Sequence, residues 1–456
     1  MKITFHGGAG SVTGANYLLE HGDIKIIVDC GLIQGSRYAE SLNYKPLKYD
    51  PKEVDFVLVT HSHIDHIGRI PMLYEQGFRG KIYATTATRD LMSVALPDNA
   101  GLMIDDARDE GREPLFQVND VPATMKLVEG ILYGETIKLA DDIKFVFRDA
   151  GHILGSSIIE LIWKESDGKE KKIVFSGDLG NPPTPLLRPT EFVGDADYVV
   201  TESTYGDRIH EPRQERQQRL INIITETVKN KGVLMIPSFA MERTQELLYE
   251  FNNICENGLC PRVPFFIDSP LAIKITDVYK QHSEYFNKKT NFQIKSGDDI
   301  FKFPELTLTR KTEQSKAIND VPAPKIIIAG SGMSQGGRII HHEKRYLPDP
   351  NSTILFVGYQ VNGSLGRRIQ QGQKVVKIHG QSVQVRCHRE TISSYSAHAD
   401  QPALIKWVEA TNSKGNLKRV FAVQGEENAS KTLANLLHDR CGIEAVVPKT
   451  DEVVEL

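Results

Sequence analysis

The sequence lacks the features that mark secreted and membrane-spanning proteins. Its five cysteines are an odd number, are scattered and form no C-x-x-C pair, which argues against a disulfide framework or a zinc ribbon. No stretch approaches the roughly 18 consecutive apolar residues of a transmembrane helix. The N-terminus also has no apolar core followed by a small-residue cleavage site. We therefore expect a cytoplasmic protein with no membrane partner.

An excess of charge of one sign is also lacking. The chain has 55 Lys and Arg against 59 Asp and Glu, a formal charge of −4, so any contact with nucleic acid needs a local basic patch. With 25% charged and 40% hydrophobic residues, the composition is that of ordinary globular proteins and excludes disordered, collagen-like and coiled-coil chains. Its 456 residues correspond to about two to three domains.

Short β-branched runs separated by glycine turns dominate the first part of the chain. We expect strands at residues 24–29, 54–60, 81–85, 143–148, 157–163, 173–176 and 197–201. Two acid-rich segments between them, residues 89–115 and 118–128, have patterns that are more helical. Residues 1–206 therefore predict a β-rich domain.

The pattern changes after Gly206. Helical patterns at residues 214–231 and 243–258 flank a buried-looking strand at 232–237, and apolar runs follow at 264–268, 325–329 and 353–358. Strands that alternate with helices favour βαβ units and a parallel sheet. Short strands return at 374–378 and 382–386, before a helix at 401–409. We therefore predict an α/β domain of residues 207–373 inserted into a β-rich domain whose second part is residues 374–456.

A dense group of metal-ligand residue types follows the strand at 54–60. Residues 61–66 read H-S-H-I-D-H, which places His61, His63, Asp65 and His66 close together. In an extended conformation the side chains at 61, 63 and 65 share one side, and His66 follows across a turn. The alternative is an exposed polar loop, but fourteen histidines in 456 residues seldom place three so near one another. The pattern favours a metal site.

Two more strand ends supply residues of the same kind. His152 follows the strand at 143–148, and Asp178 follows the strand at 173–176. Taken alone, His152 could be a hydrogen-bonded core imidazole, and Asp178 a turn or N-cap residue. Together with residues 61–66 they supply nitrogen and oxygen ligands suited to zinc. Asp29, at another strand end, either partners a ligating imidazole or caps its own turn, and the sequence leaves both open.

These residues resemble the motifs of a known family. H-S-H-I-D-H, the later His152 and S-G-D at 176–178 are similar to the motif set of the metallo-β-lactamase fold. The resemblance extends to the β-CASP nucleases, which include the pre-mRNA 3′-end cleavage and polyadenylation endonuclease and its short bacterial and archaeal homologues. It runs in order from residue 3 to about residue 428, through T-E-S-T-Y-G at 201–206, S-G-M-S-Q-G-G-R at 331–338, G-Y-Q at 358–360, G-R-R at 366–368 and S-Y-S-A-H-A-D at 394–400.

The resemblance implies a fold, a pair of metal ions and a reaction. The fold is of the α/β class, an αββα metallo-β-lactamase sandwich with an inserted α/β β-CASP domain whose parallel sheet is flanked by helices. The implied zinc ligands are His61, His63 and His152 for one ion, Asp65 and His66 for the second, and Asp178 as the bridge. Two such ions, about 3.5–4 Å apart, generate hydroxide and clamp the oxygens of a phosphodiester. The implied activity is that of a zinc-dependent endoribonuclease acting on single-stranded RNA, with a homodimer left open.

The resemblance also implies catalytic roles for three residues. Asp65 would orient the attacking hydroxide, and His398 would contact the scissile phosphate and protonate the leaving oxygen. Glu202 would hold that imidazole in orientation and favour its protonated form. The choice of RNA over DNA rests on the resemblance alone.

One position departs from the family pattern. The family has a histidine ligand in a V-H-G-E segment, where this chain reads V-Q-G-E at 423–426. Gln424 still offers a carbonyl oxygen, but an amide oxygen is a weaker zinc ligand than an imidazole. We therefore expect the second metal to be loosely held, exchangeable or replaced by manganese.

The glycine loop and a basic stretch are the candidate RNA contacts. Residues 361–389 contain six cations and no Asp or Glu, namely Arg367, Arg368, Lys374, Lys377, Arg386 and Arg389. Such a stretch is usually only a solvated face, but its place between the loop and His398 favours a groove for a phosphate backbone. The loop at 331–337 is either a tight turn or a nest of N–H groups that binds phosphate. We expect RNA contacts at Ser331, Gly332, Met333, Arg367, Arg368 and Ser396.

Two other functions remain open at the level of sequence. A thioester or lactone hydrolase could use the same metal cluster, but it has no need of the long insertion between Gly206 and Gln373. A catalytically weakened RNA-binding subunit is the other, and Gln424 motivates it. Metal content separates this subunit from a nuclease, since an inactive subunit would tolerate well under one zinc per chain.

Overall fold

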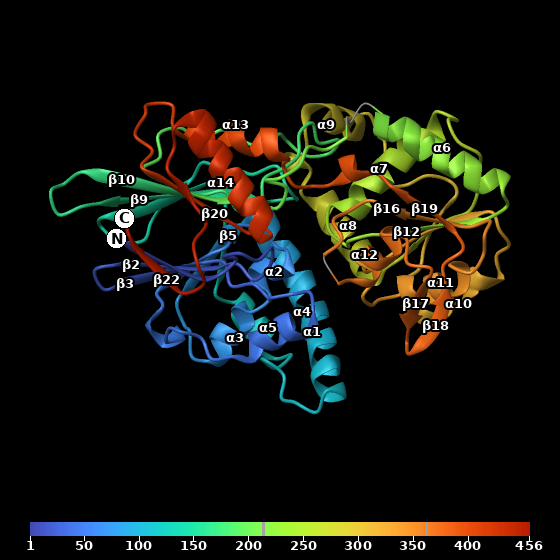
Figure 1. Cartoon of the computed structure of the whole chain (residues 1–456), viewed down its shortest axis with the longest axis horizontal. Coiled ribbons are helices and arrows are strands. Elements are labelled where there is room, and N and C mark those ends of the chain that lie inside the picture. The colour runs from blue at the N-terminus through green and yellow to red at the C-terminus, as the bar shows by residue number, and fades with distance from the viewer. Residues whose placement is uncertain (212–214, 362) are drawn as a thin grey trace. The chain divides into compact units, whose positions relative to one another are not determined.

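The chain folds into two compact units. The structure is a computed structural model that describes residues 1–211, 215–361 and 363–456 (Figure 1). The first unit combines Met1–Ile209 with His398–Leu456, and the second is His210–Ala397. Among the described residues, no helix has both the length and the apolar character needed to cross a membrane.

Two seven-stranded sheets form the centre of the first unit. The first sheet has the order β22 (Glu452–Glu455), β1 (Lys2–Gly7), β2 (Asn16–His21), β3 (Ile24–Val28), β4 (Phe56–Leu58), β5 (Lys81–Thr85) and β6 (Val128–Ile131). The second has the order β21 (Ala445–Val446), β20 (Arg419–Val423), β11 (Tyr198–Glu202), β10 (Glu170–Phe175), β9 (Ser157–Lys164), β8 (Ile143–Asp149) and β7 (Thr136–Lys138).

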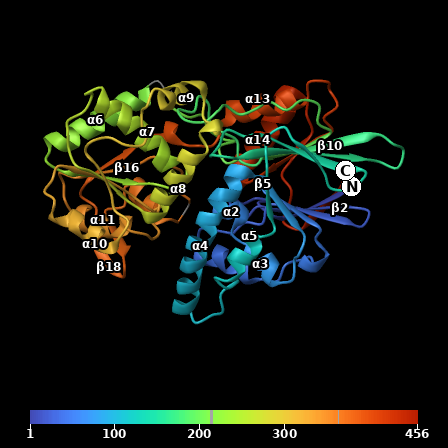
Figure 2. The same ribbon diagram turned by 180° about the vertical axis from the view of Figure 1, so that it is seen from behind.

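Helices cover the outer face of each sheet of this unit (Figures 1 and 2). The helices of the first unit are α1 (Arg37–Ser41), α2 (Ile64–Ile67), α3 (Ile70–Glu75), α4 (Thr86–Asp109), α5 (Asp120–Met125), α13 (Gln401–Thr411) and α14 (Glu427–Cys441). Apolar side chains of α2 to α5 pack on the first sheet, and those of α13 and α14 pack on the second. The predicted αββα sandwich is confirmed.

The alternation of side chains along the strands explains this layering. In β9, Ile159, Leu161 and Trp163 point into the core between the two sheets, whereas Ile158 points to the core under α13 and α14. Burial of each large apolar side chain contributes about 1.5–3 kcal/mol. The strands next to the site are therefore fixed from both faces.

Parallel neighbours in the second sheet bring chemically important residues to one edge. β10, β11 and β20 pair in parallel, so their C-terminal ends lie at the same edge of the sheet. Asp178 follows β10, Glu202 ends β11 and Gln424 follows β20. Asp29 and His61 come after the parallel neighbours β3 and β4 of the facing sheet. The fold thus gathers residues that are far apart in the sequence.

The second unit is built on a parallel six-stranded sheet, as predicted. Its order is β14 (Leu306–Leu308), β13 (Phe265–Asp268), β15 (Lys325–Ala329), β12 (Val233–Pro237), β16 (Thr353–Phe356) and β19 (His388–Thr391), and every pairing is parallel. From β12 the chain moves first toward β14 and then back toward β19. Because parallel crossovers are right-handed, this reversal puts helices on both faces.

Seven helices and one hairpin accompany the sheet in the described part of this unit. They are α6 (Arg216–Lys229), α7 (Arg243–Glu256), α8 (Pro270–Gln281), α9 (Lys288–Lys295), α10 (Thr312–Ala317), α11 (Ile339–Tyr346), α12 (Leu365–Gln370) and the hairpin β17 (Val375–Ile378) with β18 (Gln381–Gln384). Of the predicted helix at 214–231, residue 214 lies outside the described residues.

The limits of the units differ from the expected domain boundaries at 206 and 373. β19 pairs with β16, which places residues 388–391 in the six-stranded sheet of the second unit. The second unit therefore continues to Ala397. The expected boundaries mark where a segment is inserted in the sequence, whereas the two units are defined by how the chain packs. The expected boundaries therefore stay a prediction. Within the first unit, residues 118–128 are less helical than expected, since α5 ends at Met125 and β6 begins at Val128.

A buried carboxyl group lies beside the glycine loop. Glu343 of α11 is fully buried and accepts a hydrogen bond from the Ser334 hydroxyl at its Oε1 atom. Its Oε2 atom has no hydrogen-bond partner among the described residues. Burial raises the pKa of Glu343 to about 8, although the hydrogen bond from Ser334 acts in the opposite direction. The neutral acid is therefore the form that the fold favours.

Replacing Glu343 by Gln should make the stability of the protein less dependent on pH. A folded-state pKa near 8, above the ordinary value, means that Glu343 contributes stability at acidic pH that is lost as the pH rises to about 8. The contribution of Glu343 to the free energy of unfolding should fall by at most about 2–5 kcal/mol over this pH range. Thermal unfolding of both proteins between pH 5 and 9 measures it, with exposed Glu313→Gln as the control. Parallel stability curves for Glu343→Gln and the unsubstituted protein would contradict the prediction.

Candidate metal centre

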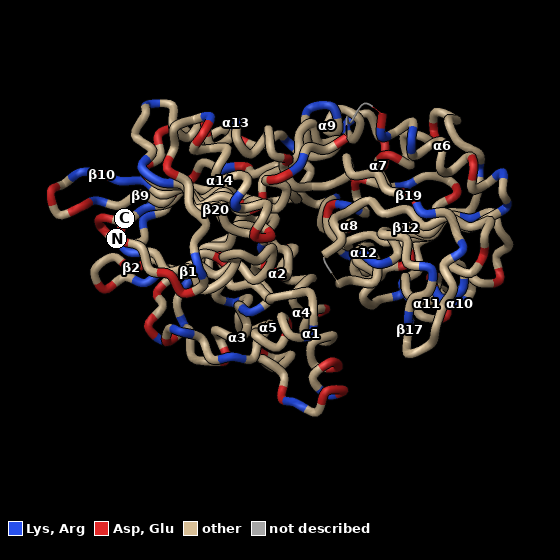
Figure 3. The backbone as a smooth tube through the Cα atoms, viewed as in Figure 1, with Lys and Arg blue, Asp and Glu red and all other residues tan. Residues whose placement is uncertain are grey.

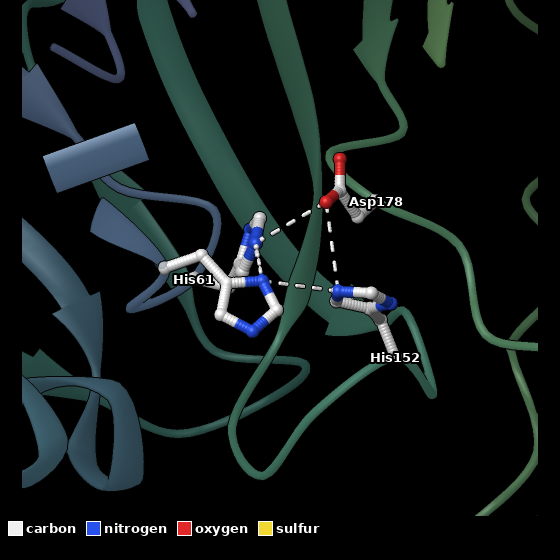
Figure 4. Close-up of side chains that lie close together, drawn as sticks. His61, His152 and Asp178 are labelled. Carbon is white, nitrogen blue, oxygen red and sulfur yellow. Dashed lines mark hydrogen bonds and ion pairs between the residues drawn. The ribbon is translucent and has the colours of Figure 1, made fainter. Parts of the chain in front are cut away.

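Three imidazoles and one carboxylate converge at the strand ends of the first unit. His61 and His63 follow β4, His152 follows β8 and Asp178 follows β10, and their donor atoms all lie within 4.8 Å of one another. His61 Nε2 is 3.0 Å from His63 Nδ1 and 3.4 Å from Asp178 Oδ2. His152 Nε2 is 3.3 Å from His63 Nδ1 and 3.5 Å from Asp178 Oδ2. Figure 4 shows His61, His152 and Asp178 pointing toward one another.

These separations fit a tetrahedral metal ion. Zinc–nitrogen and zinc–oxygen bonds of ~2.0–2.2 Å place the ligand atoms of a tetrahedron about 3.3–3.5 Å apart. Four of the six donor pairs lie 3.0–3.5 Å apart, and all six lie within 4.8 Å. The donor set of three imidazoles and one carboxylate is also of the kind that zinc prefers. The predicted ligands of the first ion are thus brought together.

Neighbouring residues orient two of the imidazoles. Asp29 accepts hydrogen bonds from the Thr60 backbone N–H, from the Thr60 hydroxyl and from His66 Nδ1, at 2.8, 2.7 and 2.7 Å. The Thr60 oxygen, having donated to Asp29, accepts from His61 Nδ1 at 3.1 Å. Both rings therefore turn the lone pair of Nε2 toward the cluster, as outer partners of metal-binding histidines do. Of the two alternatives for Asp29, the structure shows the contact with an imidazole.

Burial favours the neutral forms of His63 and His152. It lowers the pKa values of His63 and His152 well below the ordinary value, and neighbouring histidines add to this effect. Burial of Asp178 acts to raise its pKa, but the His66 and His61 rings outweigh it and hold that pKa well below the ordinary value. Neutral imidazoles next to an ionised carboxylate are the protonation states that metal binding requires.

The predicted residues of the second ion are less compact. His66 Nε2 lies 3.4 Å from Asp178 Oδ1 and 4.0 Å from Asp65 Oδ2. Gln424 approaches with its amide nitrogen, which is 2.6 Å from His66 Nε2 and 3.2 Å from Asp178 Oδ1. From the sequence, its carbonyl oxygen was a possible weak ligand. That oxygen instead accepts a long hydrogen bond of 3.5 Å from the Tyr17 hydroxyl.

Glu202 and His398 form the expected pair. His398 Nδ1 lies 3.0 Å from Glu202 Oε2, while Glu202 Oε1 accepts from the Leu179 N–H at 2.6 Å. Glu202 is fully buried, but the His398 side chain is 20% exposed and so is open to a substrate. Burial acts to lower the pKa of His398, but the Glu202 and Asp178 charges raise it to about 9. The donor atoms of Asp178, Glu202 and His398 also lie within 4.8 Å of one another.

The predicted RNA contacts all lie in the second unit. The two segments of the resemblance meet there, because Gln360 Nε2 donates to the Gly332 carbonyl at 2.9 Å and the Gly366 N–H donates to the Met333 carbonyl at 3.1 Å. Within the loop, the Ser331 hydroxyl accepts from the Gln335 N–H at 3.0 Å. These bonds make the loop an ordered element that is tied to the start of α12.

Arginines of α12 carry unsatisfied hydrogen-bond donors. The Nε atoms of Arg367 and Arg368 are buried and have no partner in the described part of the chain. Lysines and arginines continue through β17 and β19 of the same unit (Figure 3). Ser396, the last predicted contact, follows a short turn and donates its backbone N–H to the Ser393 carbonyl at 2.9 Å.

Some partners of the site were not predicted from the sequence. Thr60 and Tyr17 contact site residues but belong to no motif, and Tyr17 lies in β2, a strand that we did not predict. The Tyr395 hydroxyl donates to buried Glu250, which also pairs with Arg216, so the segment before His398 is anchored within the second unit. The only available signal for Thr60 was its place directly before His61.

Comparisons with known proteins define the class. A metallo-beta-lactamase superfamily domain matches residues 18–182, a Beta-Casp domain residues 244–369, and a Zn-dependent metallo-hydrolase RNA specificity domain residues 382–448. A crystal structure of a protein of unknown function from Enterococcus faecalis V583 shares the fold, with a TM-score of 0.55 and 14% identity over 100% of this chain and 99% of that one. The fold and the site are those of a metallo-hydrolase of the metallo-β-lactamase superfamily.

Sequence relatives narrow this class. Ribonuclease TTHA0252 of Thermus thermophilus is 37% identical over 96% of both chains. Transcription termination factor FttA of Methanosarcina mazei is 31% identical over 100% of this chain and 72% of its own length, and FttA of Thermococcus kodakarensis is 31% identical over 100% and 71%. The chain belongs to the β-CASP ribonuclease family of metallo-hydrolases, which confirms the resemblance stated from the motifs.

Proposed function

We propose that this protein is a zinc-dependent endoribonuclease that hydrolyses phosphodiester bonds of single-stranded RNA. The observation that carries the proposal is the buried cluster of His61, His63, His152 and Asp178 in a chain with an RNA specificity domain. The name of the Thermus relative, a ribonuclease, supports RNA as the substrate. The scattered cysteines support a cytoplasmic location, and a homodimer is a further expectation that light scattering tests.

Zinc would be held by the four residues of this cluster. A bound zinc ion supplies Lewis acidity, which polarises a phosphodiester and makes water nucleophilic at neutral pH. A second ion would use Asp65, His66 and the other oxygen of Asp178, with Gln424 in the position of the family's histidine. Asp65 would also orient the attacking hydroxide, which is the role we expected for this carboxylate.

The protein's own residues supply the proton for the leaving oxygen. Glu202, fixed by the Leu179 N–H, holds the His398 ring by its Nδ1 atom and stabilises the charged imidazolium. The other ring nitrogen, Nε2, would donate a proton to the leaving oxygen of the cleaved bond. A pKa near 9 keeps most of the acid form at neutral pH.

RNA would be bound by residues of the second unit. The loop at Ser331, Gly332 and Met333 offers backbone N–H groups to a phosphate, and Ser396 offers a hydroxyl. Arg367 and Arg368 have buried Nε donors without a partner among the described residues, and a phosphate oxygen is the acceptor that such a donor suits best. These contacts read the backbone and not the bases, so they predict little dependence on sequence.

Replacing Arg367 and Arg368 together by Ala should weaken RNA binding about equally for all sequences. Each lost phosphate contact should flatten the dependence of log affinity on log salt by about one unit. Filter binding of labelled single-stranded RNA at several salt concentrations measures the slope. A double replacement of exposed Lys288 and Lys289 by Ala removes the same charge from the same unit and serves as the control. Equal slopes for the two double variants would show that Arg367 and Arg368 belong to a solvated face and do not contact RNA phosphates.

Cleavage of two RNA substrates tests the function itself. An endonuclease should cut both a linear end-labelled single-stranded RNA and a covalently closed circular RNA, and chelation of metal should stop both reactions. Cutting of the linear RNA alone would contradict the endonuclease and show an exonuclease. Binding without cleavage, together with well under one zinc per chain, would indicate the RNA-binding subunit. Hydrolysis of thioesters or lactones in place of RNA would indicate the small-molecule hydrolase.

A further inference from the structure

The backbone of Gln424 is held in an unusual conformation. Its φ angle is 47°, in the left-handed region that residues other than glycine seldom adopt. The Gln424 N–H donates to the Gly8 carbonyl at 2.6 Å, and its carbonyl accepts from the Thr204 hydroxyl at 2.9 Å. A backbone kept in this region by its surroundings is a feature of functional sites. The direction of the side chain is therefore fixed.

The side chain of Gln424 has little freedom either. It is 3% exposed, and a side-chain carbon placed on Gly8 would come within 3.3 Å of its Cγ atom. The amide ends between three groups, because Oε1 faces the Tyr17 hydroxyl while Nε2 faces His66 and Asp178. The side chain is thus buried among Tyr17, His66 and Asp178.

Chemistry decides which end of the amide faces the cluster. Asp178 Oδ1 is an acceptor, so the atom 3.2 Å away from it must be the nitrogen. His66 gives its Nδ1 hydrogen to Asp29, so its Nε2 atom accepts the other amide hydrogen at 2.6 Å. The nitrogen end of the Gln424 amide is therefore the end that faces His66 Nε2 and Asp178 Oδ1.

We propose that the Gln424 amide takes the place of a second metal ion, so that this protein holds one zinc ion tightly and a second only after the amide is displaced. The inference rests on the proposed function, because it assumes that zinc occupies the first cluster. His66 Nε2 and Asp178 Oδ1 are the atoms that a second ion would need, and each already receives an N–H of Gln424. The two N–H groups present partial positive charge where the ion's charge would be.

Gln424 is in this view a positioning residue. It holds the Oδ1 atom of Asp178 on one side, so that Oδ2 stays directed at His61 and His152, at 3.4 and 3.5 Å. A hydrogen-bonded carboxylate of this kind needs no bridging ion to keep its orientation. The single-metal site is therefore complete without an additional ligand.

Zinc titration of three proteins tests the proposal, because it shows whether replacing Gln424 raises or lowers the affinity for the second zinc ion. The full-length protein, Gln424→Ala and Gln424→His are each titrated with Zn²⁺ alone by calorimetry, and bound zinc is counted by mass spectrometry. The unsubstituted protein should bind one ion tightly. Gln424→Ala should bind the second ion about tenfold more tightly than the unsubstituted protein, because two hydrogen bonds no longer compete with it. Gln424→His should approach two ions per chain, because imidazole adds a ligand.

Gln245→Ala, which removes a buried glutamine of the second unit, serves as the control and should leave both zinc affinities unchanged. Two equally tight ions in the unsubstituted protein would overturn the inference and leave the proposed function in place. Weaker second binding in Gln424→Ala would overturn it too, because the amide would then be a ligand through its oxygen. Absence of any tight zinc would overturn both proposals. If Gln424→His does not fold, the other two titrations still decide.

Discussion

Replacement of His63 or Asp178 by Ala should abolish RNA cleavage. Both residues supply donor atoms to the cluster, and Asp178 contacts two of its three imidazoles. Bound zinc should fall by more than the ~10–100-fold in affinity that an outer-shell change typically costs. Cleavage of labelled single-stranded RNA and metal content are measured on the same preparations, with circular dichroism to show that the fold is kept.

The exposed carboxylate Asp167, in the turn between β9 and β10, provides the matched control for Asp178. Asp167→Ala should retain both zinc and activity, because its side chain lies away from the strand ends that carry the cluster. Full activity of metal-depleted His63→Ala would refute the metal-dependent mechanism.

Replacement of His398 by Ala should slow cleavage by about 10²–10⁴-fold, the usual contribution of a general acid. Bound zinc should stay unchanged, since His398 is proposed to act on the leaving oxygen and not as a ligand. Glu202→Gln should have a smaller effect in the same direction, because the ring keeps a hydrogen-bond partner but loses the charge that stabilises its protonated form. Single-turnover rates with saturating protein report the chemical step directly.

Metal content decides whether the role of His398 is assigned correctly. The donor atoms of Asp178, Glu202 and His398 are close enough to hold an ion themselves. A large loss of zinc in His398→Ala would therefore show a ligand in place of an acid. Rescue of the rate by added imidazole, with zinc unchanged, would agree with proton donation.

Much of the site follows from local sequence, because its residues stand directly after strands. His61, His63, His152 and Asp178 were predicted in this way, and the structure brings their donor atoms together. The same reasoning predicted the parallel sheet of the second unit from apolar runs separated by helices. A packed strand fixes the position of the residue that directly follows it, so a local sequence pattern is enough to predict that position.

Other features depend on contacts that no local pattern records. Gln424 is hydrogen-bonded by its amide nitrogen because Gly8, Tyr17 and Thr204, all distant in the sequence, fix its conformation. The second unit extends to Ala397 because β19, a short polar strand, pairs with β16. Short strands of this kind carry little periodicity, and only the partner strand specifies them.

The parallel arrangement of β10, β11 and β20 has a consequence for how the site responds to its ion. Neighbouring strands lie ~4.8 Å apart, and this spacing sets the separation of the chain segments that carry Asp178, Glu202 and Gln424. Because these strands belong to the core, arriving zinc meets in Asp178 a ligand whose backbone has already lost its conformational freedom. The entropy cost of ordering the site is thus included in the folding of the chain and not in the binding of the metal. A mutation in the core of this sheet should therefore lower zinc affinity even though it replaces no ligand.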